Sequence, residues 1–260
     1  MGMLAFESDY QIHYERIDGD PERPCLVFLH EGLGCTAMWR KFPRMLCERT
    51  GCSGLSYDRL GYGKSSALQK VRTVHYMHEA ALQELPRVLE HLLPNRPYVL
   101  VGHSDGGSIA LILGAERPRL LKGIITEAAH VFVEPETISG IRAAVDAFDG
   151  GKLSGLTKYH GEKTTVIFKA WSLTWLSTWF RHWSLEYLLP SIDCPLLVIQ
   201  GRDDQYGTEA QVASIVSKVG GATHSILLDN CGHSPHTERP SRVLEVMSKF
   251  IEHDVPAASR

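Results

Sequence analysis

The residue most suited to chemistry is a serine set among glycines. Ser104 lies in the stretch LVGHSDGGSIAL, residues 100–111, where one apolar run ends and an apolar run of helical composition begins. A serine hydroxyl is a poor nucleophile near neutral pH, so it needs a base within hydrogen-bond reach, usually histidine, and an acid that orients the base. Glycines at positions 102 and 106 leave room for a sharp turn. The pattern predicts a nucleophile elbow between a strand and a helix.

The elements that must position this serine alternate along the chain. Short β-type runs followed by longer helical patterns are typical of a parallel sheet covered by helices. The predicted strands are residues 10–16, 25–30, 54–58, 98–103, 122–127, 195–201 and 224–229. The predicted helices lie near 38–49, 73–92, 104–116, 208–219 and 240–253, the last opened by Pro240 and Ser241. We therefore expect an α/β fold with a mostly parallel central sheet.

One segment breaks the alternation. Residues 130–189 hold helical patterns but no convincing strand, and a connection this long needs structure of its own. We expect a core domain of residues 1–129 and 190–260 with an inserted helical cap at 130–189, and a flexible point at DGGK, residues 149–152. A spacing of four would place the segment's tryptophans on one helix stripe that pins the cap or lines an apolar pocket. These are Trp171, Trp175, Trp179 and Trp183, the first three being candidates for substrate binding.

Composition narrows the class of ligand. The 260 residues are 43% hydrophobic and 22% charged, with a formal net charge of -3 that provides no basic field for nucleic acid. No apolar run approaches the roughly 20 residues of a membrane span. Charged residues occur too early in the first sixteen residues for these to hold the apolar core of a signal peptide. We expect a cytoplasmic protein with a small-molecule substrate and reduced cysteines. The sequence does not determine the oligomeric state.

Four further motifs accompany the elbow: FLHEGLG at 28–34, DRLGYGKS at 58–65, GRDDQYG at 201–207 and NCGHSPH at 230–236. Together and in this order they resemble the α/β-hydrolase family, in which the triad follows the order serine, acid, histidine. The resemblance implies that Ser104 is the nucleophile, His233 the general base and Asp204 the acid, with no cofactor. Asp203 and Glu127 are the alternative acids.

The resemblance also implies an oxyanion hole formed by the backbone N–H groups of Gly32 and Asp105. Glu31 stands where glycine is frequent in the family, so its carboxylate should point away from the developing negative charge. Asp105 has two interpretations. It stabilises the first turn of a helix through the macrodipole, or it faces the pocket and receives a cationic group of the substrate.

The remaining histidines allow simpler interpretations. His30 and His103 flank motif turns and are expected to hold loops. His75 and His78 lie one helical turn apart, and His233 and His236 three residues apart, but neither pair has an evident third ligand, so we predict no metal site. GYGKSS, residues 61–66, lacks the spacing of a phosphate loop and is interpreted as a structural turn after Asp58.

The function implied by the resemblance is a serine hydrolase of the carboxylesterase type, which cleaves a small carboxylic ester through an acyl-enzyme. Thioesterases, amidases and carbon-carbon bond hydrolases use the same triad, and the last group would be favoured if Arg142 or Arg181 lined the pocket for a substrate carboxylate. A serine at the elbow argues against the members that use an aspartate nucleophile. A different class, a small-molecule receptor of this fold with slow turnover, would bind its ligand with few turnovers.

Overall fold

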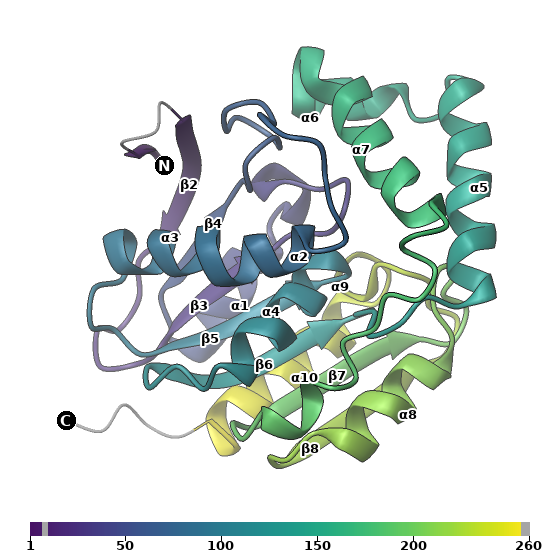
Figure 1. Ribbon diagram of the computed structural model, residues 1–260. Helices are drawn as coiled ribbons and strands as arrows, with labels where there is room; N and C mark the ends of the chain where they lie inside the picture. The colour runs from purple at the N-terminus through teal and green to yellow at the C-terminus, as the bar shows by residue number, and fades with distance from the viewer. Residues whose placement is uncertain (7–9, 256–260) are drawn as a thin grey trace.

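The computed structural model describes residues 1–6 and 10–255, and within them the chain forms an eight-stranded sheet (Figure 1). The spatial order is β1-β2-β4-β3-β5-β6-β7-β8, in which β1–β2 and β2–β4 are antiparallel and the other pairs are parallel. The strands are β1 Gly2–Phe6, β2 Tyr10–Ile17, β3 Cys25–Leu29, β4 Gly54–Tyr57, β5 Tyr98–His103, β6 Leu121–Glu127, β7 Leu196–Gly201 and β8 Thr223–Leu228. The predicted α/β class with a mostly parallel sheet is confirmed.

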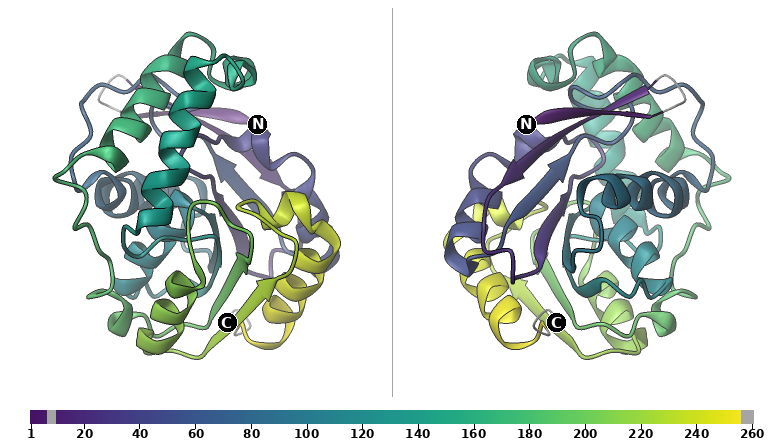
Figure 2. Two further views of the ribbon diagram at one scale, coloured as in Figure 1. Left: turned by 90° about the vertical axis from the view of Figure 1, so that its right-hand side faces the viewer. Right: turned by 90° about the vertical axis from the view of Figure 1, so that its left-hand side faces the viewer.

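Helices cover both faces of this sheet (Figure 2). One apolar cluster lies under α1 (Phe42–Thr50) and α10 (Pro240–His253), and the other under α3 (Leu85–Leu92), α4 (Asp105–Ala115) and α8 (Glu209–Lys218). Every residue of β3 and β5 is buried, as expected for parallel strands packed on two sides. The carboxyl ends of these strands therefore form one edge at which loops can bring side chains together.

Two elements differ from the predicted ones. Strand β1 was not predicted because Met3 and Ala5 occupy the exposed side of this edge strand, so no apolar–polar alternation marks it. The continuous helix predicted over 73–92 begins at Tyr76 and is divided into α2 (Tyr76–Glu79), a π-helical turn η2 (Ala80–Glu84) and α3. Pro86, which has no N–H to donate, lies just after the π-helical turn, so the interruption of the α-helical ladder falls beside it.

Residues 130–189 connect β6 to β7 and carry three helices, α5 (Pro135–Asp149), α6 (Thr157–His160) and α7 (Thr164–Leu176), with short turns between them. These helices stand beside the carboxyl edge of the sheet (Figure 1). Helix α7 packs on α5 through stacked rings of Phe148 and Phe168, whose centroids are 3.9 Å apart. A single β-bridge between Phe132 and Ser184 joins the two ends of the segment.

The expected stripe of four tryptophans is wrong, because α7 ends at Leu176. Ser177 adopts an extended conformation, and its hydroxyl donates to the carbonyl oxygen of Thr174 at 2.6 Å. Trp171 and Trp175 therefore lie on the helix, whereas Trp179 and Trp183 follow it. None of the helices among the described residues is long and apolar enough to cross a bilayer.

Candidate active site

Ser104 occupies a strained turn between β5 and α4. Its backbone angles are φ 53° and ψ −117°, and its N–H donates to the carbonyl of Glu127 at 2.8 Å. A Cβ atom at Gly102 would collide with the carbonyl oxygen of Gly106, and one at Gly106 would collide with that of Leu29. Both glycines are therefore required by close backbone approach, and the turn holds the serine at the carboxyl edge of the sheet.

A chain of hydrogen bonds runs from this serine to an acid in the loop after β7. Ser104 Oγ lies 2.9 Å from Nε2 of His233, and Nδ1 of the same ring lies 2.8 and 2.9 Å from Oδ1 and Oδ2 of Asp204. The imidazole can accept the serine proton on Nε2 while Nδ1–H donates to the carboxylate. This is the arrangement that a serine nucleophile needs.

Asp204 is held by donors on both oxygens. The N–H of Tyr206 donates to Oδ1 and the side-chain amide of Gln200 to Oδ2, each at 2.8 Å. Burial alone would raise the pKa of Asp204, but the charge and hydrogen bond of His233, with the Tyr206 amide, lower it below its usual value. The carboxylate is thus held ionised. The neighbouring Asp203 is exposed and makes no such contact.

The loop that carries His233 is fixed from two directions. His103 Nε2–H donates to the carbonyl oxygen of His233 at 2.7 Å. The carboxylate of Glu238 accepts from the N–H groups of Gly232 and Ser234, at 2.7 and 3.0 Å, on either side of the histidine. These contacts set the position of the ring relative to Ser104. They agree with the expectation that His103 holds a loop.

Glu127, the alternative acid at the end of β6, is engaged with another histidine. Its Oε2 lies 2.5 Å from Nδ1 of His236, whose ring packs on Trp39 with a centroid distance of 4.6 Å. Burial would lower the pKa of His236, but the charge and hydrogen bond of Glu127 raise it above its usual value. The two histidines of the NCGHSPH motif therefore belong to separate carboxylate pairs.

Gly32 and Asp105, whose amides are expected at the oxyanion hole, line the same cavity as Ser104. Asp105 is the first residue of α4, so its N–H has no acceptor within the helix. A Cβ atom at Gly32 would lie 2.6 Å from Nε1 of Trp171, so any side chain there would meet the indole. The Glu31 carboxylate turns toward His103, with Oε2 3.7 Å from Nδ1 of that ring, in line with the expectation that it points away from the developing negative charge.

The Asp105 side chain is buried in the wall of the cavity rather than exposed at the helix surface. Its Oδ2 accepts from the hydroxyl of Tyr76 at 3.0 Å and lies 3.8 Å from Nη1 of Arg59. Oδ1 has no hydrogen-bond partner within residues 1–6 and 10–255. One oxygen is thus committed to the protein and the other remains free for a donor in the cavity.

The cavity has a volume of about 360 Å³ and lies between the catalytic edge and the 130–189 segment. Its apolar wall comes largely from that segment and includes Ile141, Leu153, Leu156, Trp171 and Trp175. Trp175 also donates from Nε1 to the hydroxyl of Tyr76 at 3.0 Å, which links the segment to the core. Trp179 is 50% exposed and lies outside the lining, unlike the expectation for it.

Three side chains near the candidate triad of Ser104, His233 and Asp204 were not predicted. The ring of Tyr206 lies 4.7 Å from that of His233, and His130 lies 5.9 Å from the same ring and 5.3 Å from Trp175. Tyr76 holds Asp105 from α2. His130 follows the end of β6 and Tyr206 follows Asp204 by two residues, so position alone could have placed these two at the edge. Nothing in the sequence signals Tyr76.

The other histidines have structural surroundings. His30 donates from Nδ1 to the Glu31 carbonyl at 2.8 Å and accepts the Arg59 N–H on Nε2 at 3.1 Å. Burial, with the charge of Arg59, lowers the pKa of His30 to about 3. The rings of His75 and His78 are 5.9 Å apart. No group of three or more His, Cys, Asp and Glu side chains suited to a metal ion occurs in the described part of the chain.

The turn after Asp58 is built around that carboxylate. The N–H of Thr36 donates to Oδ1 at 2.6 Å, and the N–H of Lys64 donates to Oδ2 at 2.8 Å. GYGKSS, residues 61–66, therefore folds around an aspartate of the protein itself, in keeping with a structural turn.

The comparison with protein families agrees with this fold. The Alpha/beta hydrolase family matches residues 26–246, which is most of the chain. The chain belongs to the alpha/beta hydrolase family.

Individual relatives have diverse activities. The sn-1-specific diacylglycerol lipase ABHD11 of Mus musculus is 23% identical over 92% of this chain and 85% of its own length. A proline iminopeptidase of Saccharolobus solfataricus is 24% identical, covering 87% of this chain and 84% of that protein. Among solved structures, VinJ is 26% identical with a TM-score of 0.73 and covers 98% of both chains. The enol-lactonase of Burkholderia xenovorans LB400 shares the fold, with a TM-score of 0.74 at 18% identity over 97% of this chain and all of the other.

Proposed function

We propose that this protein is a serine hydrolase that cleaves a small carboxylic ester through an acyl-enzyme, with Ser104 as nucleophile, His233 as general base and Asp204 as the orienting acid. The observation that carries the proposal is the unbroken hydrogen-bond chain from Ser104 Oγ to His233 and on to Asp204. A protein that only bound a ligand would have no use for a nucleophile, a base and an acid connected in this order.

The reaction follows from this geometry. Ser104 Oγ attacks the ester carbonyl as its proton passes to Nε2 of His233, and the oxyanion accepts hydrogen bonds from the N–H groups of Gly32 and Asp105. Collapse expels the alcohol, which takes the proton from His233. Water, deprotonated by the same Nε2, then attacks the acyl-serine and releases the carboxylic acid and free Ser104. Asp204 stabilises the imidazolium in both halves.

The 130–189 segment serves as the cap of this site and provides the apolar part of the substrate pocket. Trp171 is 7% exposed and Trp175 is 2% exposed, and both line the cavity beside Ser104. A pocket of about 360 Å³ suits a small ligand. The proposed substrate therefore has a short apolar acyl or aryl group that the two indoles cover.

The carbon-carbon hydrolase alternative loses its main support. Arg142 and Arg181 are exposed, and neither they nor any other arginine or lysine of the described residues lines the catalytic cavity. A substrate carboxylate would meet no cation there. Thioesters and amides use the same groups, and a small panel of substrates separates them from esters.

A second candidate feature of the substrate is a hydrogen-bond donor near the scissile carbonyl. The observation that favours it is Oδ1 of Asp105, which lacks a partner within the described residues although the residue is only 1% exposed. A buried carboxylate oxygen is stabilised by an ammonium or hydroxyl group placed within reach. An ester of an α-amino acid would supply that group.

The test is hydrolysis by the purified protein beside Ser104→Ala. The panel contains p-nitrophenyl acetate and butyrate, phenylalanine ethyl ester, ethyl 3-phenylpropanoate as its match without the amine, an aryl thioester, and a ring-cleavage dienoate. Multiple turnovers lost in Ser104→Ala support the serine hydrolase. Turnover that survives in Ser104→Ala, or tight binding with no turnover of any substrate, contradicts it. A preference for the phenylalanine ester that disappears in Asp105→Asn supports the donor.

A further inference from the structure

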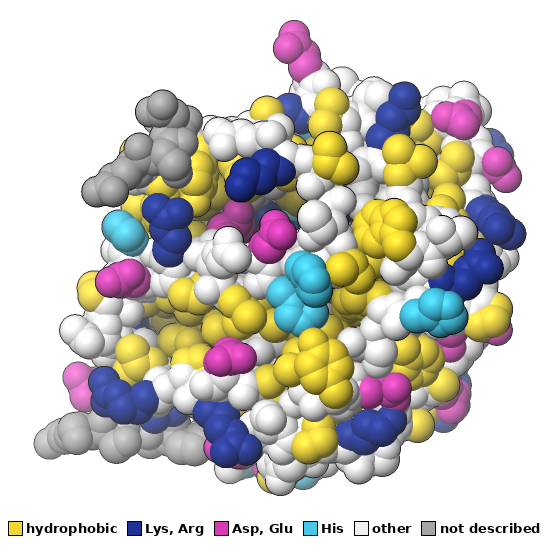
Figure 3. All heavy atoms as spheres, in the orientation of Figure 1, with side chains coloured by type: hydrophobic (Ala, Val, Ile, Leu, Met, Phe, Trp, Pro, Cys, Tyr) yellow, Lys and Arg dark blue, Asp and Glu magenta, His cyan; other side chains and the backbone are white. Residues whose placement is uncertain are grey.

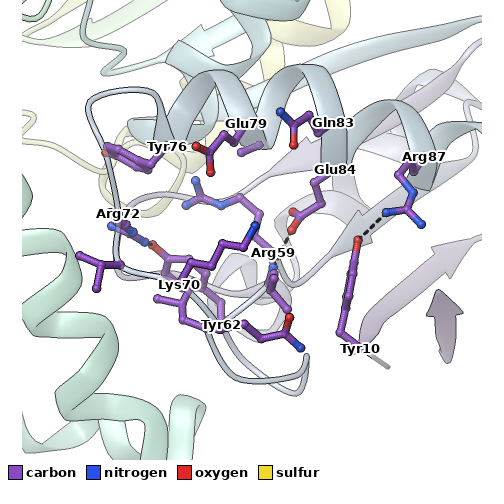
Figure 4. Close-up of a pocket in the computed structure, with 15 residues that line it drawn as sticks. Tyr10, Arg59, Tyr62, Lys70, Arg72, Tyr76, Glu79, Gln83, Glu84 and Arg87 are labelled. Atoms are coloured by element: carbon purple, nitrogen blue, oxygen red, sulfur yellow. Dashed lines mark hydrogen bonds between the residues drawn. The ribbon is translucent and has the colours of Figure 1, made fainter. Parts of the chain in front are cut away.

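A second cavity lies behind the wall that carries Asp105, and its lining is richer in charge than that of the catalytic cavity. It also measures about 360 Å³ and is bounded by the loop residues 59–62 and 68–72 on one side and by α2, η2 and α3 on the other. Figure 4 shows its labelled side chains converging from these two sides and, with Tyr10, from the start of β2. In Figure 3 basic and acidic side chains surround a hollow between this loop and those helices.

Basic side chains outnumber acidic ones in this lining. The basic residues are Arg59, Lys70, Arg72 and Arg87, and the acidic residues are Glu79 and Glu84. Within the described residues only Arg59 has a carboxylate within 4.0 Å, namely Asp105, which belongs to the catalytic side of the wall. Among residues 1–6 and 10–255, the lining of the second cavity therefore carries more positive than negative charge.

Arg72 is the centre of this excess. Its guanidinium lies over the rings of Tyr62 and Tyr76, at 5.5 and 4.6 Å from their centroids, and donates from Nη2 to the Tyr62 hydroxyl. Nη1 is buried and has no hydrogen-bond partner among residues 1–6 and 10–255. An unpaired buried donor on a cation is costly, and a carboxylate satisfies a guanidinium better than any neutral group.

The acidic residues do not offset this charge fully. Glu79 lies on the exposed side, and Glu84 accepts the N–H of Leu60 on Oε2 at 2.9 Å. Burial raises the pKa of Glu84 to about 7, because desolvation outweighs the Leu60 hydrogen bond and the charge of Arg59. Near neutral pH this carboxyl is partly protonated, which weakens its repulsion of an anion.

Apolar and aromatic groups complete the lining. Leu60, Leu68 and Val71 line the cavity together with Tyr62 and Tyr76. This combination suits a ligand with a flat or apolar body and one anionic end. We propose that the second cavity is a binding site for a small organic carboxylate, whose carboxylate group pairs with Arg72 and Lys70 and whose apolar body lies against the tyrosines.

The proposal is tested by crystallography of the protein with 4-bromobenzoate, since the anomalous signal of bromine locates the ligand directly. Bromine between the 68–72 loop and α2, with the carboxylate on Arg72, supports the proposal. Bromine only in the catalytic cavity, only on the surface, or at no ordered position overturns it. This readout does not depend on the proposed hydrolase activity.

Titration calorimetry with the same ligand measures how much individual residues contribute to the binding affinity. Arg72→Gln should weaken binding at least about tenfold, the usual effect of losing a charge-assisted hydrogen bond. Lys70 is exposed, so Lys70→Gln tests the charge without disturbing the packing and should weaken binding by a few fold. Arg142→Gln, an exposed change on the cap, is the matched control and should leave binding unchanged. Equal affinity in all four proteins overturns the assignment.

The chemical class is tested with three aryl compounds that replace the carboxylate of the ligand by another group. 4-Bromobenzamide is neutral and should bind at least about tenfold more weakly than 4-bromobenzoate, because it cannot form the ion pair. 4-Bromobenzylamine is cationic and should not bind. Phenyl phosphate separates a carboxylate site from a general phosphate site. Tighter binding of the amide, the amine or the phosphate than of the carboxylate contradicts the proposal.

Discussion

Replacement of Asp204 by asparagine gives the sharpest test of the proposed acid, because the structure fixes what an amide would do there. Both carboxylate oxygens lie within hydrogen-bond distance of His233 Nδ1, and in addition Oδ1 accepts from the Tyr206 N–H and Oδ2 from the Gln200 side-chain amide. An asparagine NH₂ placed at Oδ2 would face the Gln200 NH₂, and one placed at Oδ1 would face the Tyr206 N–H. In either position it would also lie within reach of His233 Nδ1 and would favour the His233 tautomer that carries its proton on Nε2. That tautomer cannot accept the proton of Ser104.

The expected loss is large because catalysis then depends on the disfavoured tautomer or on an unpaired amide. We expect kcat of Asp204→Asn to fall about 10³- to 10⁴-fold, which corresponds to about 4 to 5 kcal/mol of transition-state stabilisation. The assay is initial-rate hydrolysis of p-nitrophenyl butyrate, with circular dichroism to establish that the variant is folded.

The matched control is the adjacent residue. Asp203 has the same chemistry but is exposed, so Asp203→Asn should retain the rate of the parent protein within about twofold. The reasoning is refuted if Asp204→Asn keeps more than about a tenth of the activity, or if Asp203→Asn loses as much as its neighbour.

Three further predictions concern the pocket, the pH dependence of stability and the cap. Trp171→Ala should lower kcat/KM for the butyrate ester relative to the acetate by about 10- to 100-fold, since a buried aromatic wall is lost, while Trp179→Ala, outside the cavity, should leave the ratio unchanged. Burial raises the pKa of Glu84 from its ordinary 4.5 to about 7, so the stability that depends on the protonated Glu84 side chain is fully present below pH 4.5 and is lost as the pH rises through 7. Glu84→Gln should therefore raise the free energy of unfolding, measured in urea, by at most about 3 kcal/mol at pH 8 and should leave it nearly unchanged at pH 4. An identical pH dependence of stability in both proteins would rule out this assignment. Gly150 has a φ of −76° that alanine also adopts, whereas Gly151 lies at +77°, and the Gly150 N–H donates to the Asp146 carbonyl at 2.9 Å, which rules out proline there. Gly150→Ala keeps this hydrogen bond and should stiffen the end of α5, so it should slow a large ester more than p-nitrophenyl acetate; equal slowing of both would argue against movement of the cap during substrate entry.

The sequence allowed a correct prediction where the backbone conformation permits only certain residue types. The glycines at 102 and 106 are there because backbone approaches too closely for a Cβ atom, and this requirement is visible in the letters alone. The order of serine, acid and histidine follows from strand order, so the family's pattern located Ser104, Asp204 and His233 near one another before any coordinates. The parallel sheet followed from the alternation of short β-type runs with longer helical patterns.

Other features depend on tertiary contacts that no local pattern records. Helix α7 ends at Leu176, because Ser177 adopts an extended conformation, so the four-residue spacing does not place all four tryptophans on one helix face. The spacing of the residues does not show whether Glu127 pairs with His233 or with His236. The pairing depends on the conformation of the loop after β8. Tyr76 and Arg59 reach Asp105 from segments far apart in sequence, so the buried network behind the catalytic cavity could not be predicted.

The central claim is that Ser104 becomes acylated during turnover, and rapid-quench mass spectrometry of the protein with p-nitrophenyl butyrate tests it most directly. The account predicts a transient butyryl adduct that peptide mapping places on Ser104, that decays as butyrate is released and that is absent from Ser104→Ala. Continued turnover in Ser104→Ala, or an adduct on another residue that forms and decays at the catalytic rate, would contradict it.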